Sequence, residues 1–273
     1  MQEKILNDIR YRNVFKRTYQ NRFDEFDNIC IDAMKHFIIS SNKVLVHDLA
    51  VSDGRTSYDF YKLLIKQSPG EIIYFASDIL PYVFEISTVG SRVKTIIDKG
   101  QNVIQVIFPP FVFNEFSQDN KLYFINLMLK YVIDRTVVKA QLRDVRNNEA
   151  KLVIKKIYLV DKKCRDLMSV DHNFSFESYD IFDRATRQVN IVRAMNILNP
   201  TYFPQSDIKI ILRNIHDSLL VDGYLIVGSN GDKGSCVDGG IYQKMNTGFI
   251  SLRHAAVPSR INQVIIDFDR TEL

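Results

Sequence analysis

The chain has 273 residues, 46% hydrophobic and 25% charged, which is close to the globular average and excludes an intrinsically disordered chain. The length fits one large α/β domain with a small accessory part better than two equal domains. With 36 Lys and Arg against 32 Asp and Glu, the net charge of +4 is too weak to indicate a nucleic-acid-binding protein by itself. No apolar run reaches about 18 residues and no apolar signal core occurs at the start, so we expect neither a membrane span nor export.

Cysteine and histidine are few and scattered. The three cysteines, Cys30, Cys164 and Cys236, lie far apart and are odd in number, which argues against a disulfide framework or a zinc cluster. The five histidines lack the spacing of metal ligands. We therefore expect a cytoplasmic protein without a metal site.

The first 22 residues are basic, with six Lys and Arg against two acidic residues. This predicts either a solvated helix face or a docking arm for an acidic partner. Apolar residues from Phe15 to Phe37 recur at steps of three and four, so residues 12–39 are predicted to form one or two amphipathic helices. We assign residues 1–42 to an N-terminal helical segment.

A βαβ unit follows this segment. Residues 43–51 form a short, β-branched, apolar run that is typical of a buried parallel strand. A polar turn at residues 52–55 leads into a helical stretch at 56–67, and a second buried strand at 71–77 ends at Asp78. Two strands joined by a helix are expected to lie parallel with a right-handed crossover.

Residues 80 to about 150 interrupt the pattern. Residues 92–97 and 102–108 flank a polar turn and predict a hairpin, which Pro109-Pro110 ends. Residues 122–145 have the apolar spacing of a long amphipathic helix. We interpret this part as an insertion at one edge of the sheet, where a substrate lid is commonly built.

Strands resume after the insertion. The pattern predicts strands at 153–160, 173–178 and 188–195, a helix at 206–220, a strand at 224–229, a loop between Gly228 and Gly240, and antiparallel strands at 240–244, 248–253 and 263–267. Residues 43–273 are thus predicted to form one α/β domain, with a mostly parallel sheet, an antiparallel C-terminal strand pair and an inserted hairpin-plus-helix.

In an open α/β sheet, ligands bind outside the carboxyl ends of the strands, near the point where the strand order reverses. The polar residues after each predicted strand are therefore the candidate ligand-binding residues: Asp48 to Gly54, Asp78, Asp180, and Arg193 to Asn196. A carboxylate at such a position can accept paired hydrogen bonds from vicinal ribose hydroxyls. The structural alternative for each is a helix cap or a surface turn. The sequence contains no P-loop, no dinucleotide-binding glycine motif and no nucleophile elbow.

The run Asp48-Leu49-Ala50-Val51-Ser52-Asp53-Gly54 resembles the D/E-x-G-x-G-x-G loop of class I S-adenosylmethionine-dependent methyltransferases. Gly54 matches the last glycine, while Ala50 and Ser52 replace the first two by other small residues. Asp78 is similar to the ribose-binding acid of that family, and residues 178–182 resemble its adenine-binding segment.

Residues 189–203, the following helix and LLVDGYLIVGS resemble the later strand–helix–strand arrangement of the same family. Arg193 and Asn196 distantly resemble the Arg-Asn pair of the chemotaxis-receptor glutamate methyltransferase branch, although two residues separate them here. The resemblance covers roughly residues 43–78 and 173–270.

This resemblance implies a Rossmann-like fold and a methyltransferase with S-adenosyl-L-methionine as cofactor. The methyl acceptor would be a small molecule or a protein side chain, and no residue is marked as catalytic. The implied cofactor-binding residues are Asp48, Ala50, Ser52, Gly54, Asp78, Ile79, Asp180, Ile181, Arg193 and Asn196. Asp48 would bind the amino group of the cofactor, Asp78 its ribose, and Asp180 with Ile181 its adenine.

Two alternatives remain open. Asn199-Pro200-Thr201-Tyr202 is one residue away from the N-P-P-Y motif, so the chain could be an N-methyltransferase of nucleic acid or of a protein amide; as a structural feature the motif is a turn. The missing glycines at Ala50 and Ser52 also fit a non-catalytic interaction module that keeps the fold.

Overall fold

The computed structural model describes residues 10–11, 14–15, 22–114, 124–147, 152–231 and 236–272. The chain divides into two compact units. The smaller unit comprises Met1–Arg17 and Leu80–Val160, and the larger comprises Thr18–Ile79 and Asp161–Leu273. No helix in the described ranges has both the length and the apolar character needed to cross a membrane.

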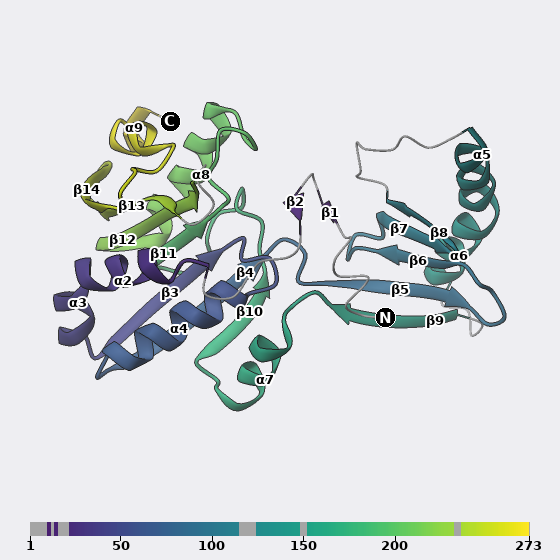
Figure 1. The fold of residues 1–273 in the computed structure, drawn as a ribbon, viewed down its shortest axis with the longest axis horizontal. Coiled ribbons are helices and arrows are strands. Elements are labelled where there is room, and N and C mark those ends of the chain that lie inside the picture. Colours follow the sequence, from purple (N-terminus) through teal and green to yellow (C-terminus); the bar gives the residue numbers. More distant parts are fainter. Residues whose placement is uncertain are drawn as a thin grey trace. The chain divides into compact units, whose positions relative to one another are not determined.

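The larger unit is built on a seven-stranded sheet in the order β10-β4-β3-β11-β12-β13-β14 (Figure 1). Its strands are β3 (Lys43–Leu49), β4 (Glu71–Asp78), β10 (Phe174–Ser178), β11 (Val189–Met195), β12 (Leu219–Asn230), β13 (Val237–Lys244) and β14 (Phe249–His254). The first five strands in the sheet run parallel, and β13 and β14 continue it as antiparallel hairpins. The predicted fold class, an α/β protein with a mostly parallel sheet, is confirmed.

Helices cover both faces of this sheet (Figure 1). On one face lie α2 (Asp24–Ala33), α3 (Lys35–Ser40), α4 (Arg55–Gln67) and α7 (Lys162–Val170), and on the other lie α8 (Gln205–Ser218) and α9 (Asn262–Ile266). The core under α8 combines Ile211 and Leu212 of the helix with Val192, Leu225 and Val227 of the strands. Alternation along the strands therefore supplies apolar residues to both faces, as expected for a buried parallel sheet.

The smaller unit is an antiparallel sheet in the order β8-β7-β6-β5-β9. Its elements are β5 (Tyr82–Thr88), β6 (Lys94–Ile97), β7 (Val103–Phe108), β8 (Phe111–Asn114), β9 (Leu152–Tyr158), α5 (Phe124–Ile133), the π-helical turn η1 (Asp134–Val138) and α6 (Lys139–Arg146). The short β1 (Arg10–Tyr11) pairs with β2 (Val14–Phe15). The predicted hairpin and helix are present, and β5, β8 and β9 extend the hairpin into a full sheet.

Four predictions of local structure were wrong at least in part. The loop expected between Gly228 and Gly240 is strand at both ends, because β12 extends to Asn230 and β13 begins at Val237. The strand expected at 153–160 is β9, which pairs with β5 and not with the parallel sheet. Residues 263–267 form most of helix α9 and not a strand, because Ile261 and Ile265 pack into the core under α8. Val14 and Phe15 pair with β1 as a strand and are not helical as predicted, and the first helix among the described residues is α2, which begins at Asp24.

The basic N-terminal arm lies mostly outside the described residues. The N-terminal helices instead pack closely on the sheet. A Cβ atom at Gly239 of β13 would lie 2.5 Å from the ring of Phe26, so only glycine allows α2 to approach this strand so closely.

Candidate functional site

The candidate site lies at the carboxyl edge of the parallel sheet, where the strand order reverses. Strand β3 lies between β4 and β11, so the chain proceeds from β3 to one side of the sheet and later returns on its other side. Open α/β sheets bind ligands at this switch point. The turn that joins β3 to α4 leaves the sheet there.

This turn holds three alternate residues in the left-handed region. Ala50 has φ 53°, Ser52 has φ 60° and Gly54 has φ 82°. Only glycine adopts this conformation without cost, and each other residue stores about 1–3 kcal/mol of strain. The positions that the sequence comparison aligned with three glycines are thus the three that need glycine-like backbone. Strain of this kind, held in place by its surroundings, gathers at ligand-binding sites.

The neighbouring strand fixes the turn. The N–H of Val51 donates to the carbonyl of Ser77 at 3.0 Å, and the N–H of Ser52 donates to Oδ2 of Asp78 at 2.9 Å. The Ser52 hydroxyl is buried and has no hydrogen-bond partner among the described residues. A buried hydroxyl without a partner at a strained turn is a group that a ligand could satisfy.

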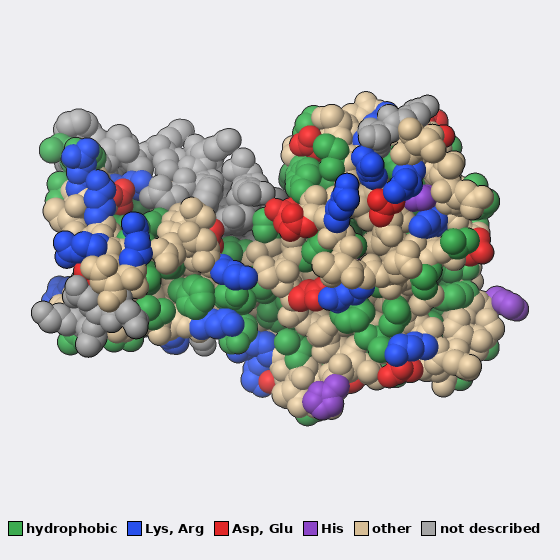
Figure 2. All heavy atoms as spheres, turned by 180° about the vertical axis from the view of Figure 1, so that it is seen from behind, with side chains coloured by type: hydrophobic (Ala, Val, Ile, Leu, Met, Phe, Trp, Pro, Cys, Tyr) green, Lys and Arg blue, Asp and Glu red, His purple; other side chains and the backbone are tan. Residues whose placement is uncertain are grey.

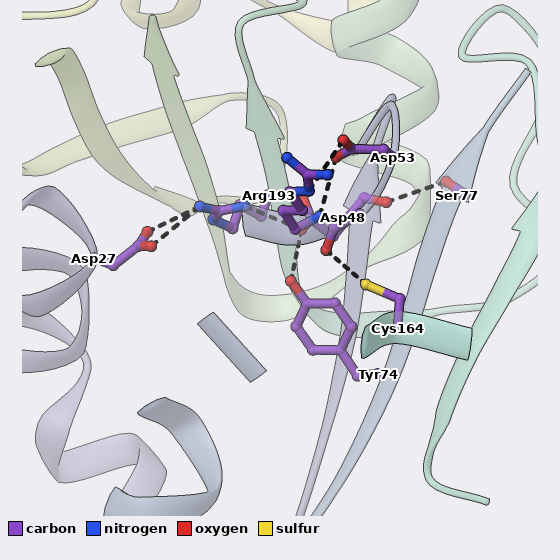
Figure 3. A network of polar contacts seen from close by, with 9 residues as sticks. Asp27, Asp48, Asp53, Tyr74, Ser77, Cys164 and Arg193 are labelled. Carbon is purple, nitrogen blue, oxygen red and sulfur yellow. Dashed lines mark hydrogen bonds and ion pairs between the residues drawn. The ribbon is translucent and has the colours of Figure 1, made fainter. Parts of the chain in front are cut away.

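Gly54 ends the turn and begins α4. A Cβ atom there would lie 2.9 Å from the Phe176 ring and 3.1 Å from Sγ of Cys164, so β10 and α7 pack directly against this residue. The Cys164 thiol donates to the Gly54 carbonyl at 3.1 Å (Figure 3). Burial raises the pKa of this thiol, which keeps it protonated as a donor and not as a nucleophile.

Asp78, Ile79 and Asp180 follow β4 and β10 at the same edge. Asp78 is buried, and its carbonyl accepts from the N–H of Tyr179, which joins the ends of the two strands. Oδ1 of Asp180 accepts from the N–H of Phe182 in the next turn. Ile181 points elsewhere: it is buried in the core under α8.

Asn196 occupies the corresponding place after β11, also with a left-handed φ of 59°. Its N–H donates to the Gly228 carbonyl at 2.7 Å, and its Oδ1 accepts from the N–H of Asn230 at 2.8 Å. This side chain therefore joins the ends of β11 and β12. Strands β3 and β11 are therefore each followed by a residue with a left-handed backbone, Ala50 and Asn196 respectively.

The side chains of Asp48 in β3 and Arg193 in β11 meet on the face of the sheet that α2 covers (Figure 3). Arg193 donates from Nη1 to Asp48 at 3.0 Å and from Nη2 to both oxygens of Asp27 in α2, at 3.0 and 3.2 Å. The Tyr74 hydroxyl donates to the same Oδ2 of Asp48 at 2.6 Å. The Asp48 carboxylate, which was expected to bind a ligand, is thus engaged inside the protein, and so is Arg193.

The charges of this buried cluster depend on one another. Burial acts to lower the pKa of the Arg193 guanidinium, but Asp27 and Asp48 outweigh it and raise the pKa well above its usual value. Burial raises the pKa of Asp27 to about 6, against the opposing effect of Arg193. Arg193 therefore stays a cation inside the protein, held between Asp27 and Asp48.

Aromatic rings enclose the same guanidinium. Cζ of Arg193 lies 4.8 Å from the Phe60 ring centroid and 5.7 Å from that of Phe23. Asp27 and Tyr74 were missed by the sequence analysis, because Asp27 lies 166 residues from Arg193 in the sequence and the contact of Tyr74 with Asp48 depends on the register of β3 and β4. One signal was available: Asp27 is a charged residue next to Phe26, on the apolar stripe of a predicted helix.

The Asn199–Tyr202 motif forms a turn. The Asn199 side-chain oxygen accepts from both the N–H and the hydroxyl of Thr201 at 3.0 Å, and Tyr202 is 47% exposed. These bonds stabilise the turn that leads into α8. They engage the amide oxygen with which the motif would hold a substrate.

A shallow cavity of about 190 Å³ opens beside the first turns of α4 and α7, lined by Arg55, Tyr58, Asp59, Asp161 and Lys163. Nε of Arg55 lies 2.9 Å from Asp161 and 3.5 Å from Asp53, so ion pairs connect these helix ends. The charges are balanced within the cavity wall. This arrangement stabilises the start of α4 immediately after the strained turn.

No family model and no curated protein matches the chain. It is similar to the solved CMeT domain of the citrinin polyketide synthase, with 12% identity and a TM-score of 0.31, over 70% of this chain and 30% of that one. It is also similar to the N-methyltransferase NodS from Bradyrhizobium japonicum in complex with S-adenosyl-l-homocysteine (10% identity, TM-score 0.34, 83% and 70% of the two chains).

An S-adenosylmethionine-dependent methyltransferase from Clostridium acetobutylicum is similar at 8% identity and a TM-score of 0.36, over 89% of this chain and 78% of that one. The chain spans less than two thirds of the length of the first of these proteins. Similarities this weak do not assign a function, which is proposed below from the geometry of this chain.

Proposed function

We propose that this chain binds S-adenosyl-L-methionine at the carboxyl edge of the larger unit and transfers its methyl group to an acceptor. The observation that carries the proposal is the β3–α4 turn, in which Ala50, Ser52 and Gly54 hold alternate left-handed conformations at the switch point of the sheet. Strained backbone of this kind clusters at sites where the backbone and a ligand come close together, and here two strained residues and a glycine lie in one turn.

The residues at this edge fit the cofactor. Small side chains at Ala50 and Ser52 leave room for its methionine portion, and the buried Ser52 hydroxyl offers a hydrogen bond. Asp78 would hold the ribose hydroxyls through its carboxylate, which already anchors the turn through Ser52. Ile79 and Asp180 would lie along the adenosine portion.

Two of the expected ligand-binding residues have a different role in this proposal. Asp48 and Arg193 fix the strands below the edge, because they bond to one another, to Asp27 and to Tyr74 within the protein. Ile181 supports the site from the core, and Asn196 shapes the end of β11. The cofactor would then be bound by the β3–α4 turn, Asp78, Ile79 and Asp180.

The cofactor supplies an electrophilic methyl group on a sulfonium, so the protein has to align an acceptor with it and exclude water. The turn contributes to this alignment, because its bonds to Ser77 and Asp78 hold its backbone in one conformation. The acceptor class, a small molecule or a protein side chain, stays open in this proposal.

Isothermal titration calorimetry with S-adenosylhomocysteine tests the proposal. We expect a dissociation constant in the micromolar range, about −8 kcal/mol. Asp78→Asn keeps one oxygen to accept from Ser52 but loses the charge, so binding should weaken at least about tenfold. Glu71→Gln, at the opposite end of β4, is the matched control and should bind as the wild type does.

An absence of binding by the folded wild type, or unchanged binding by Asp78→Asn, would contradict the proposal. One observation favours the second candidate, a non-catalytic module: Asp48 and Arg193 engage one another instead of facing the edge. A folded protein without affinity for the cofactor would support that candidate. The N-methyltransferase alternative is not favoured, because the Asn199 oxygen is already engaged in its own turn.

A further inference from the structure

The two units carry opposite charge. The segment Leu80–Val160 of the smaller unit has 12 Lys and Arg against 7 Asp and Glu. The larger unit, residues 18–79 and 161–273, has 19 Lys and Arg against 23 Asp and Glu. The modest net charge of the whole chain therefore conceals a basic unit attached to an acidic one. Charge separated in this way indicates an anionic partner for the basic unit.

Four of the cations of the smaller unit lie along one helical face. Arg135 of η1 and Lys139, Arg143 and Arg146 of α6 follow one another at steps of four, four and three residues, and all four are exposed. We call these four residues the basic stripe. It extends along roughly 16 Å of helix, with one cation for each turn. Figure 2 shows Lys and Arg gathered at the end of the smaller unit, where these helices lie.

The opposite side of η1 and α6 packs against the core and the sheet of the smaller unit. Val138 is buried in the core of the smaller unit, and Gln141 bonds to Thr95 at 2.7 Å and to the Val93 carbonyl at 3.3 Å. The α6 helix therefore has no apolar face left to insert into a membrane. Within the described ranges, Lys139 and Arg146 have no carboxylate partner, and the exposed Arg143 pairs with its neighbour Asp144, which is half-buried. The stripe is available for phosphates.

Exposed aromatic rings accompany the cations. Tyr131 is 58% exposed, and Cζ of Arg135 lies 4.9 Å from its ring centroid. On the sheet, Nζ of Lys156 lies 3.8 Å from the centroid of Tyr82 and 4.8 Å from that of Tyr158. Both sets combine a flat ring with a cation, the pairing that binds a base together with its phosphate.

The two sets lie on the same side of the sheet. Tyr82 pairs with Tyr158, and two residues further along each strand alternation places Phe84 and Lys156 opposite one another. Ile86 follows on β5 and is the register partner of Thr95, the residue that bonds to α6. By strand alternation, the rings and Lys156 therefore project on the side of the sheet that α6 covers.

We propose that the smaller unit binds single-stranded nucleic acid, with the basic stripe holding about four consecutive phosphates and Tyr131 and the Tyr82–Tyr158 pair stacking bases. Charge alone would suit any polyanion. The exposed rings beside the cations favour unstacked bases over a duplex, an acidic protein or a lipid surface. This inference does not depend on cofactor binding by the larger unit.

Fluorescence anisotropy of the full chain with a labelled 20-nucleotide oligo-dT tests the inference. We expect micromolar binding at 50 mM salt that weakens steeply as the salt concentration rises. Substituting the stripe (Arg135→Gln, Lys139→Gln, Arg143→Gln and Arg146→Gln together) should weaken binding at least about tenfold and reduce the logarithmic salt slope by about 3. Tyr131→Ala should weaken oligo-dT binding about fivefold.

The matched control removes four exposed cations from the larger unit: Lys35→Gln, Lys43→Gln, Lys66→Gln and Lys162→Gln. It has the same net charge as the stripe variant and should bind oligo-dT as the wild type does. Circular dichroism shows whether each variant is folded. Equal loss in both variants, or no binding at 50 mM salt, overturns the inference. Tighter binding to a duplex, to poly-glutamate or to phosphatidylserine vesicles than to oligo-dT also overturns it.

Discussion

The neighbouring strands β3, β4 and β11 carry two polar regions, a buried cluster of ion pairs and a candidate ligand-binding site. Below the sheet, Asp48 and Arg193 meet Asp27 in a buried cluster in which the carboxylates face a cation. At the edge, a few residues further on, a strained turn and Asp78 form the candidate site. Asp48 and Asp78 have the same chemistry and lie on the same face of the sheet, because Asp48 is the register partner of Ala76, two residues before Asp78. What separates the structural carboxylate from the candidate ligand-binding one is the position along the strand: Asp48 lies next to Arg193 and Tyr74, whereas Asp78 lies at the end of β4 beside the turn.

The difference between these two regions also explains which features of the molecule could be predicted from the sequence. The βαβ unit and the carboxyl-edge position of the turn follow from strand periodicity and small residues, and both were predicted. The roles of Asp48 and Arg193 were not predictable, because Asp27 lies 166 residues from Arg193 in the sequence. Likewise, β9 reads as one more apolar strand, and only its pairing with β5 places it in the second sheet.

The largest expected effect comes from breaking the buried cluster. Arg193→Met leaves the carboxylates of Asp27 and Asp48 buried without a cation, which should lower the free energy of unfolding by about 3–5 kcal/mol. Urea denaturation measures this loss. Arg187→Met, at a half-buried arginine paired with Glu177, should cost about 1 kcal/mol or less.

A second substitution sharpens this test. Adding Asp27→Asn to Arg193→Met removes one uncompensated charge, so the double variant should be more stable than Arg193→Met alone. If the two losses simply add, then Asp27 and Arg193 do not interact in the way that the geometry indicates.

The next effect concerns pH and His47, on the opposite face of β3 from Asp48. Its Nε2 lies 2.9 Å from the Ser77 hydroxyl, and burial, together with Arg187, lowers its pKa to about 4. Between about pH 6.5 and 4 the unfolded chain therefore binds a proton that the folded protein does not. This should remove about 3 kcal/mol of stability as the pH falls through this window.

Protonation of Asp27 changes the free energy of unfolding in the opposite direction, because its raised pKa of about 6 favours the folded state as the pH falls toward 4. The informative quantity is thus the stability of the wild type minus that of His47→Gln. This difference should fall by about 3 kcal/mol between pH 7 and pH 4. The control His36→Gln removes an exposed histidine of α3 in place of a buried one.

The smallest effect tests the strain at the edge. Ala50→Gly should raise the free energy of unfolding by about 1 kcal/mol, because glycine adopts the left-handed conformation without strain. The control Asp222→Gly removes the same kind of strain at φ 60° within strand β12, outside the site. A loss of stability in Ala50→Gly would show that the turn is not strained.

Hydrogen exchange of the wild-type protein, with and without saturating S-adenosylhomocysteine, tests whether the β3–α4 turn and Asp78 bind the cofactor. We expect slower exchange in peptides that cover residues 50–54 and the end of β4 near Asp78, and unchanged exchange in the strands β5 to β9 of the smaller unit. Unchanged exchange in the β3–α4 turn, or protection confined to the smaller unit, would contradict it.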